Sequence, residues 1–421
     1  MALGAECYTG AMSPHTTDPL QADAEAIFSA AVAAAQPGQA VARALRARPL
    51  VEGPVALFAL GKAAAAMAAG AVDTLGERRV ASGVLITPVP GSSPHPALLT
   101  ATGNHPVPGP ESNHAAEIVA DAVAAAAPGD VALVLLSGGT SSLVGAPADG
   151  VDRAGYETLV RALLRSGVDI AAMNAERRRV SRWGGGRLAR ALAARGVAAI
   201  RVLLVSDVVG DDPAVIGSGP CFPDADDDPA FRLVTHEVVA GNSTALDGAA
   251  RRARELGYEV VSDGSPLTGE ASGAGDGLAK RLLRLEAERR GVCLLAGGET
   301  TVALGTGPTG SGGRAQELSL AAARVLAQRP EAAVLLLAAG TDGRDGPTDA
   351  AGAVVTPATW AAIRKAGFDP AQALTRHAAY PALDGAGALL RTGLTGTNVM
   401  DVVVGLVRGG AEAPGGSRAR R

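Results

Sequence analysis

The clearest chemical signal in the sequence is the stretch from Leu294 to Ala323, LLAGGETTVALGTGPTGSGGRAQELSLAAA. An apolar run ends in glycines around Glu299, and glycines recur up to Arg314, where an alanine-rich helical pattern begins. Glycine-rich backbone at a helix start exposes N–H groups that bind anions such as phosphate. We predict that the loop Gly305–Gly313 wraps a nucleotide or phosphate, with Glu299 and Arg314 at its two ends. The alternative is a disordered connection.

Two common nucleotide motifs are weak or missing in this stretch. Gly305-Thr-Gly307-Pro-Thr-Gly310 has the G-x-G-x-x-G spacing of a dinucleotide fingerprint, but it follows a loop and Pro308 interrupts it. No suitable acidic residue ends a second strand about 20 residues further on. The phosphate-loop motif G-x-x-x-x-G-K-[ST] is missing from the sequence. An NAD(P)-dependent hydroxypyruvate reductase is therefore kept as the alternative enzyme class, and a ligand-binding protein without activity as a third class.

Two further strand ends carry a charge or small polar residues. Lys62 follows an apolar run in LGKAAAAM, at a helix start where positive charge opposes the helix dipole unless an anion offsets it. The segment Leu136-Ser-Gly-Gly-Thr-Ser-Ser142 lacks the G-x-S-x-G spacing of a hydrolase nucleophile. We interpret it as backbone that approaches a carboxylate or phosphate. A solvated surface lysine is the alternative for Lys62.

Charged residues gather in two more segments. Asn174-Ala-Glu-Arg-Arg-Arg-Val-Ser181 places three arginines before a glycine turn, where they either clamp an anionic substrate or form a solvated face. Asp207, Asp211 and Asp212 surround another strand end, where carboxylates can hold Mg²⁺ or accept a proton from a hydroxyl. A helix N-cap is the competing role for Asp212. His105, in a proline-rich loop, is the one histidine that we expect near a site.

The composition predicts a globular protein of about two domains. Of the 421 residues, 47% are apolar and 19% charged, whereas only 3% are aromatic. The net charge of −4 gives no basic field for nucleic acid. The three scattered cysteines suit neither a disulfide framework nor a zinc site. We see no secretion signal and no apolar run long enough to span a membrane, so we expect a cytoplasmic protein.

Short β-rich runs alternate with alanine-rich helical stretches, which is typical of an α/β protein with mainly parallel strands. Five of the strands end in glycine or polar residues, and ligands bind at the carboxyl ends of strands in such sheets, so we expect one shared cleft. A domain boundary is expected near the charged stretch Arg284–Arg290. The predicted strands are Val55–Leu60, Gly83–Thr87, Val131–Leu136, Ile200–Ser206, Glu259–Ser262, Val292–Ala296 and Val334–Ala338.

Taken together, the motifs resemble the glycerate 2-kinases of the bacterial class II type, which carry a C-terminal MOFRL domain. The resemblance extends from about Leu57 to Asp401 and is carried by GKAAAAM, NHPVPG, SGGTSSLV, RRVSRWGGGRLA, SDVVGDDP, GSGPCFPD, PLTGEA, GGETTV, GGRAQE, AGTDGRDGPTDAAGA and TGTNVMD, in this order. It implies transfer of the ATP γ-phosphoryl group to the 2-hydroxyl of D-glycerate, with Mg²⁺. The chain departs from the family at three positions: Gly184 replaces a lysine, Cys221 a threonine and Leu394 a proline. Arg178 or Arg182 is the candidate substitute for the lysine.

The resemblance also implies how the chain is divided. We expect two α/β domains that face a cleft. The larger, Rossmann-like three-layer domain is predicted at residues 21–285, and the smaller MOFRL domain at residues 286–408. A disordered leader (1–20) and tail (409–421) are expected to flank them.

The predicted site residues lie in the same motifs. Lys62, Asp207 and Arg314 are expected to be catalytic, and Asp207 and Asp211 to serve Mg²⁺ or the proton of the hydroxyl. The substrate is expected at Ser137, Gly138, Gly139, Ser141, Asn174, Arg177 and Arg178. The nucleotide is expected at Gly298, Glu299, Thr300, Gly312, Gly313 and Asp342. ATP, Mg²⁺ and a small hydroxy acid are the expected ligands of a monomer or homodimer, and nucleic acid and membranes are not expected partners.

Overall fold

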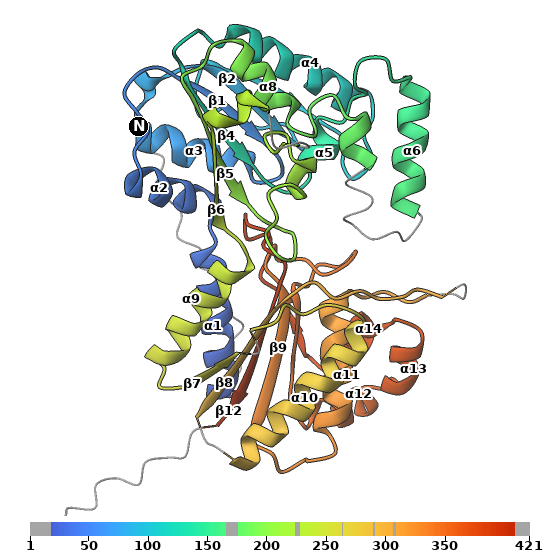
Figure 1. Cartoon of the computed structure of the whole chain (residues 1–421). Helices are drawn as coiled ribbons and strands as arrows, with labels where there is room; N and C mark the ends of the chain where they lie inside the picture. The colour runs from blue at the N-terminus through green and yellow to red at the C-terminus, as the bar shows by residue number, and fades with distance from the viewer. Residues whose placement is uncertain are drawn as a thin grey trace, which may run out of the picture. The chain divides into compact units, whose positions relative to one another are not determined.

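The computed structural model describes residues 18–165, 176–223, 228–262, 264–288, 291–305 and 309–408. Contacts within the chain divide these residues into two compact units. The first unit draws on residues 33–245 and 396–400, and the second on residues 18–32, 246–395 and 401–408. Each unit is built on one six-stranded sheet (Figure 1).

The first sheet is entirely parallel. Its strand order is β3-β2-β1-β4-β5-β6. Every position of β1, VALFAL, and of β4, VALVLL, is buried, as continuous apolar runs predict for strands covered on both faces. The strands are β1 Val55–Leu60, β2 Val80–Thr87, β3 Leu98–Thr102, β4 Val131–Leu136, β5 Ala199–Val205 and β6 Val234–Ala240.

Helices cover both faces of the first sheet (Figure 1). Helices α2 and α3 lie on one face, and α4 and α8 lie on the other. An apolar cluster that includes Phe58, Val119 and Leu188 fills the space between the sheet and the second pair. The elements of this unit besides its strands include α2 Pro37–Ala47, α3 Ala64–Leu75, α4 Pro110–Ala125, α5 Thr140–Leu143, α6 Arg153–Arg165, α8 Arg187–Ala194, η1 Glu77–Arg79, η2 Ile216–Ser218 and η3 Pro229–Leu233.

The second sheet is mixed, with the order β11-β10-β9-β12-β8-β7. Strand β12 lies between β8 and β9 and runs antiparallel to both, whereas β7 pairs with β8 in parallel. The expectation of mainly parallel strands is therefore correct for the first sheet and wrong for the second, because β12 enters the sheet's centre in the opposite direction. The strands are β7 Glu259–Ser262, β8 Val292–Gly298, β9 Val334–Gly340, β10 Gly352–Val355, β11 Leu389–Leu390 and β12 Asp401–Val407.

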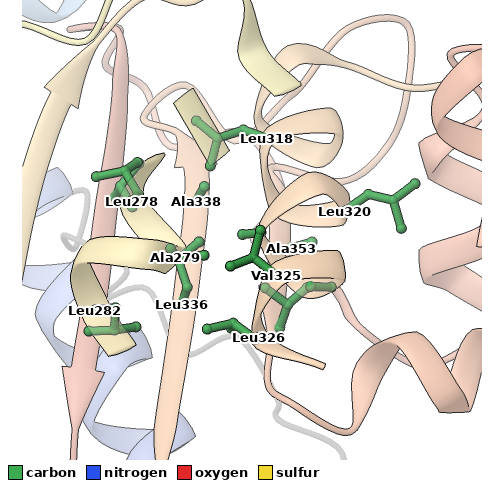
Figure 2. Packing of buried hydrophobic residues seen from close by; sticks show 14 of the residues in the cluster. Leu278, Ala279, Leu282, Leu318, Leu320, Val325, Leu326, Leu336, Ala338 and Ala353 are labelled. Atoms are coloured by element: carbon green, nitrogen blue, oxygen red, sulfur yellow. The ribbon is translucent and has the colours of Figure 1, made fainter. Parts of the chain in front are cut away.

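Helices α10 and α11 pack against each other on one face of the second sheet, and α1 and α9 lie on the other (Figure 1). Figure 2 shows Leu282 of α10 and Leu326 of α11 on either side of Leu336 in β9. A β-carbon at Gly275 of α10 would lie 2.1 Å from the carbonyl oxygen of Leu318, so glycine allows the two helices to come close. The helices include α1 Pro19–Ala34, α9 Asn242–Glu255, α10 Ala271–Glu288, α11 Arg314–Leu326, α12 Thr359–Lys365, α13 Pro370–Thr375 and α14 Ala379–Gly385.

The expected fold class is confirmed: a larger three-layer α/β unit with a parallel sheet is followed by a smaller α/β unit. The division falls near residue 245, however, because β7 and α10 belong to the second unit although both begin before residue 285. Helix α1 also joins that unit and begins at Pro19, within the segment 1–20 that we expected to be a leader. Residues 1–17 and 409–421 lie outside the described part of the chain. Among the described helices, none has the length and apolar character that crossing a membrane would require.

Candidate active site

The strand order of the first sheet reverses between β1 and β4, and ligands of such sheets bind outside the carboxyl ends of the strands at that point. Lys62 lies just after β1, and Ser137 directly follows β4. The two loops are tied together, because the Lys62 N–H donates to the Gly138 carbonyl oxygen at 2.9 Å and the Ala63 N–H donates to Ser137 Oγ at 3.0 Å. Ser137 is buried, so its hydroxyl holds the start of α3 in place.

Asp207 follows β5 and lies against the same loop. A β-carbon at position 138 would lie only 1.8 Å from Asp207 Oδ2, so Gly138 is the residue that lets this carboxylate reach the backbone. Burial raises the pKa of Asp207 above its ordinary value of 3.8, and the nearby positive charge of Lys62 opposes the rise. A carboxylate with a raised pKa beside a lysine can accept a proton from a bound hydroxyl.

His105 adjoins the same turn. A β-carbon at Gly139 would lie 3.1 Å from His105 Cδ2 and 3.2 Å from Lys62 Cγ. Gly139 has a φ of 85°, which glycine adopts without strain. Partial burial and, secondly, the charge of Lys62 lower the pKa of His105 from 6.5 to about 4. His105 is therefore neutral beside Lys62 at neutral pH, and its proline-rich loop reaches the cluster as expected.

The arginines of the run that precedes the glycine turn differ in their surroundings. Arg179 is exposed and pairs with Glu176, which is the solvated arrangement that a charge run also allows. Arg178 donates a hydrogen bond to the carbonyl oxygen of Ala214 and so supports the backbone. Asn174 lies outside the described residues.

Arg177 lines a narrow pocket together with Ser141, Tyr156 and Ser218. Its Nε and Nη2 atoms are buried and have no hydrogen-bond partner within the described part of the chain, and the same is true of Ser218 Oγ. Burial lowers the pKa of Arg177 and raises that of Tyr156 to about 12. A carboxylate or phosphate bound here would supply the partners that these N–H groups lack.

The two aspartates after Asp207 have separate surroundings. Asp212 Oδ1 accepts a hydrogen bond from the Ala214 N–H at 2.8 Å, but residues 213–215 form a turn and Val215 is the N-cap of η2, so Asp212 stabilises a turn and is not the helix cap that the sequence suggested. Asp211 has a buried Oδ1 with no hydrogen-bond partner among the residues that the structure describes. Within those residues, no group of three or more His, Cys, Asp or Glu side chains is placed to hold a metal ion. Magnesium, however, often takes only one or two protein carboxylates together with substrate phosphates.

In the second unit, Arg314 begins α11 and binds two carboxylates from other elements. Its Nε donates to Asp401 Oδ2 at 2.6 Å and its Nη2 to Asp401 Oδ1 at 3.1 Å, and its Nη1 donates to Glu299 Oε1. Burial alone would lower the pKa of Arg314, but the hydrogen bonds and charges of Asp401 and Glu299 raise it. Glu299 and Arg314, predicted at the two ends of the glycine loop, thus bind each other at its base.

Asp345 is a structurally central residue that we did not single out from the sequence, although the motif AGTDGRDG contains it. Its Oδ1 accepts from the Ala315 N–H at 3.1 Å and its Oδ2 from the Gln316 N–H at 2.7 Å, so it caps α11. A β-carbon at Gly313 would lie 2.2 Å from Asp345 Cγ. Burial raises the pKa of Asp345 to about 7 against the effect of these hydrogen bonds. The glycine before α11 therefore makes room for a carboxylate of the chain itself.

The remaining residues predicted to bind nucleotide have local structural contacts. Gly298 has a φ of 145° and lies close to the backbone of Leu267. Asp342 Oδ1 accepts a backbone N–H two residues further on at 3.0 Å. Thr300 is buried, and its hydroxyl has no partner in the described part of the chain. Gly312 lies against the start of α14. Because residues 306–308 lie outside the described residues, the wrapping of the glycine loop around a ligand stays a prediction.

Comparison with known proteins follows the same division of the chain. Residues 23–246 match a domain of unknown function, DUF4147, and residues 292–401 match the MOFRL family. The chain is 36% identical over 386 residues to a D-glycerate 2-kinase of Thermotoga maritima, which covers 84% of this chain and 90% of the relative. The crystal structure of a glycerate kinase from Thermotoga maritima is similar with a TM-score of 0.83 and 33% identity, and the match covers 92% of this chain and 99% of that chain. The chain belongs to the MOFRL-type glycerate 2-kinase family.

The names within this glycerate 2-kinase family differ. A protein of Agrobacterium vitis that carries the name of a hydroxypyruvate reductase is 36% identical over 412 residues, which cover 89% of this chain and 92% of that relative. The glycine fingerprint that suggested a reductase neither directly follows a strand nor directly precedes a helix, because β8 ends at Gly298 and α11 begins only at Arg314. The structure thus gives this fingerprint no dinucleotide-binding context.

The position that departs from the glycerate 2-kinase family, Gly184, is buried beside the Arg177 pocket. A β-carbon at Gly184 would lie 3.3 Å from the carbonyl oxygen of Ser218. Arg182, one candidate to replace the missing lysine, pairs with Glu117 instead. Arg177, with its unpartnered buried nitrogens in the described structure, is the cation that this pocket offers.

Proposed function

We propose that this chain is an ATP-dependent kinase that phosphorylates the 2-hydroxyl of D-glycerate, or of a closely related small hydroxy acid, and releases ADP. The observation that carries the proposal is the meeting of Lys62 and Asp207 beside the Gly138–Gly139 turn, at the point where the sheet order reverses. Phosphoryl transfer needs a base for the hydroxyl, cations for the phosphate oxygens and accurate positioning. Family membership supports the same reaction.

The acceptor acid is proposed to lie between Asp207 and the Arg177 pocket. Asp207 takes the proton of the attacking hydroxyl, and burial, by raising its pKa, makes it a stronger base for this transfer. Lys62 binds the oxygens of the transferred group. Arg177 binds the acceptor carboxylate through its two buried nitrogens, and Ser141 lines the same pocket.

Magnesium is proposed to enter with ATP. Asp211, whose buried Oδ1 lacks a partner in the described structure, is the carboxylate that would hold the ion while Asp207 acts as the base. Bound there, it would neutralise charge on the nucleotide phosphates.

For the second unit, we propose that Arg314 is a positioning residue. Its guanidinium holds Glu299 and Asp401 together, and Asp345 occupies the first-turn N–H groups of α11. Nucleotide contacts by Gly298, Glu299, Thr300, Gly312, Gly313 and Asp342 remain a separate prediction. It is tested by measuring the KM for ATP of Thr300→Val, which removes a hydroxyl with no partner among the described residues.

A coupled assay of ADP release tests the proposed reaction. D-glycerate, L-glycerate, D-lactate and glycolate are offered with ATP and Mg²⁺, and phosphorus NMR identifies the product. We expect saturable turnover of D-glycerate. The substitution Lys62→Ala should lower its kcat by about 10²–10³, whereas Lys280→Ala, at an exposed lysine on α10, should leave it unchanged. Absence of ADP release with every acid contradicts the proposal. Oxidation of NADH by hydroxypyruvate under matched conditions would instead establish the reductase suggested by the name of the Agrobacterium relative.

A further inference from the structure

A cavity of about 380 Å³ lies beside Lys62, on the side of the first sheet formed by β1, β2 and β3. Its lining includes Ala65 at the start of α3, Thr87 at the end of β2, and Thr100 at β3. The loop after β2 forms one wall, and Val89 in that loop has 65% of its surface exposed. An open cavity with a cation at one end and an uncovered apolar side chain in its wall suggests a ligand of two chemical parts.

The lining chemistry does not suit the acceptor acid. Lys62 is the one charged side chain among the described residues of the cavity wall, and the others are apolar or carry hydroxyl groups. A three-carbon hydroxy acid is small and anionic, and it would leave most of the cavity and its apolar wall uncovered. Cavities of this size ordinarily hold drug-sized or cofactor-sized molecules. The carboxylate of the acceptor is better matched in charge by Arg177, whose buried Nε and Nη2 have no partner in the described part of the chain.

The register of the strands places the cavity on one face of the sheet. Leu85 pairs with Thr100 and Thr87 with Thr102, and these residues line the cavity, as does Ala65 of α3. The cavity, which Ala65 of α3 lines, therefore lies on the face of the first sheet that α2 and α3 cover (Figure 1). In parallel sheets of the order 3-2-1-4-5-6, a nucleotide binds outside the carboxyl ends of the strands at the point where the order reverses. Lys62, which lines the cavity, follows β1 at that point.

We propose that this cavity binds the nucleoside part of ATP, with the phosphates directed toward Lys62. The base covers Val89 and the apolar wall, and the hydroxyl of Thr100 or Thr102 is available to ribose or base. The hydroxyl of Thr87 is not available as a donor, because its Oγ1 already donates to the Val89 carbonyl oxygen at 2.7 Å. This inference rests on the proposed kinase function for the identity of the nucleotide. It assigns nucleoside recognition to the first unit, where the sequence had predicted nucleotide contacts in the second.

Filling the cavity from two sides tests the proposal. Ala65→Trp enters from the first turn of α3, and Thr100→Trp enters from the edge strand, away from Lys62; both residues are exposed. Ala124→Trp, at an exposed position of α4 outside the cavity, is the matched control. For each variant we measure thermal unfolding, ADP affinity by calorimetry, and the KM values for ATP and D-glycerate. If one of the two cavity variants does not unfold cooperatively, its binding and kinetic values are not used, and the values of the other variant test the proposal.

The proposal expects both cavity variants to weaken ADP binding and to raise the KM for ATP by about tenfold or more, because tryptophan takes the space of the base. The KM for D-glycerate and the control variant should stay within about twofold of the wild-type chain. A rise in the KM for D-glycerate with an unchanged KM for ATP overturns the proposal in favour of an acceptor site. If the cavity variants keep their affinity for ADP and Thr300→Val raises the KM for ATP, the proposal is overturned, and the nucleoside is recognised by the second unit.

The calorimetric arm separates this inference from the proposed reaction. If no acid is phosphorylated but Thr100→Trp still weakens ADP binding, the cavity is a nucleotide site and the kinase proposal fails. If D-glycerate is phosphorylated normally by both tryptophan variants, the kinase proposal stands and the cavity assignment fails.

Discussion

Gly138→Ala tests whether the approach of Asp207 to the Gly138 backbone matters for catalysis. The added β-carbon would lie 1.8 Å from Asp207 Oδ2, whereas real contacts of this kind are essentially never below 3.0 Å. The carboxylate must therefore retreat by at least about 1.2 Å, the difference between these two distances. A misplacement of about 1 Å can cost about 100-fold in rate, so we expect kcat/KM for D-glycerate to fall by about 10² or more. The crowding should cost about 1–3 kcal/mol of stability.

The assay is ADP release at varied D-glycerate, with urea unfolding to measure stability. Gly155→Ala in α6 is the control, because a β-carbon there meets only an ordinary contact of 3.5 Å with Asp152. Its kcat/KM should not change, and its helix should gain up to about 1 kcal/mol.

A double-mutant cycle identifies the cause of the loss. If Gly138→Ala acts by displacing Asp207, it should cost little further activity in an Asp207→Asn background, since the base is already lost. A folded Gly138→Ala chain with kcat/KM within about threefold of the wild-type value would refute the reasoning. Full additivity of the two substitutions would show that Gly138 acts through another contact.

Three further results are expected. Lys62→Ala should lower kcat by about 10²–10³, because the role of this side chain is to bind anionic oxygens, and it should not shift Tm, because the side chain is exposed. An unchanged kcat/KM would show that Lys62 is a solvated surface residue with no part in the reaction. A pH profile should show kcat/KM increasing with pH as the Asp207 carboxyl, whose pKa is raised by burial, loses its proton. Because the charge of Lys62 opposes this rise in pKa, Lys62→Ala should move the increase to higher pH. A shift to lower pH would show that the ammonium does not act on Asp207. Asp401→Asn should lower the free energy of unfolding by about 3–5 kcal/mol, since it removes the buried carboxylate that pairs with Arg314. Asp384→Asn, at the exposed pair with Arg391, should lower it by under about 1 kcal/mol. Urea unfolding followed by Trp360 fluorescence measures both, and equal losses would contradict a structural role for the Asp401 pair.

The sequence predicted the central strands of the first sheet well because continuous apolar runs have one simple explanation, and it also predicted the short edge strand β7 of the second sheet. Val55–Leu60, Val131–Leu136 and Glu259–Ser262 have the bounds that the structure shows. Strands β3, β6, β10, β11 and β12 were missed. Strands β3 and β6 mix buried and exposed positions, and β10 and β11 are only four and two residues long. Strand β12 was missed although every one of its positions is buried. Which sheet Glu259–Ser262 would join could not be predicted, since a four-residue pattern carries no information about its partner strand.

The candidate site could be predicted as motifs but not as contacts. Lys62 and Asp207 were found because charged residues at strand ends are rare enough to notice, and the strand order then brings them together. The partners of Arg314 were not predicted, because Asp401 lies far along the chain and meets it only once β12 enters the sheet. Asp345 was missed because one aspartate in a glycine-rich turn has no distinctive spacing.

The place of β12 has a consequence for how the chain is made. The strands β8 and β9 have β12 as their shared neighbour, yet β12 leaves the ribosome after both of them and after every other strand described in the structure. The first sheet can form while synthesis continues, whereas the second must wait with two unpaired, apolar strand edges, VCLLAGG and VLLLAAG. During that interval the nascent chain is exposed to pairing with other chains. A nascent chain arrested before Asp401 should therefore hold a folded first unit and an unfolded, chaperone-dependent second one.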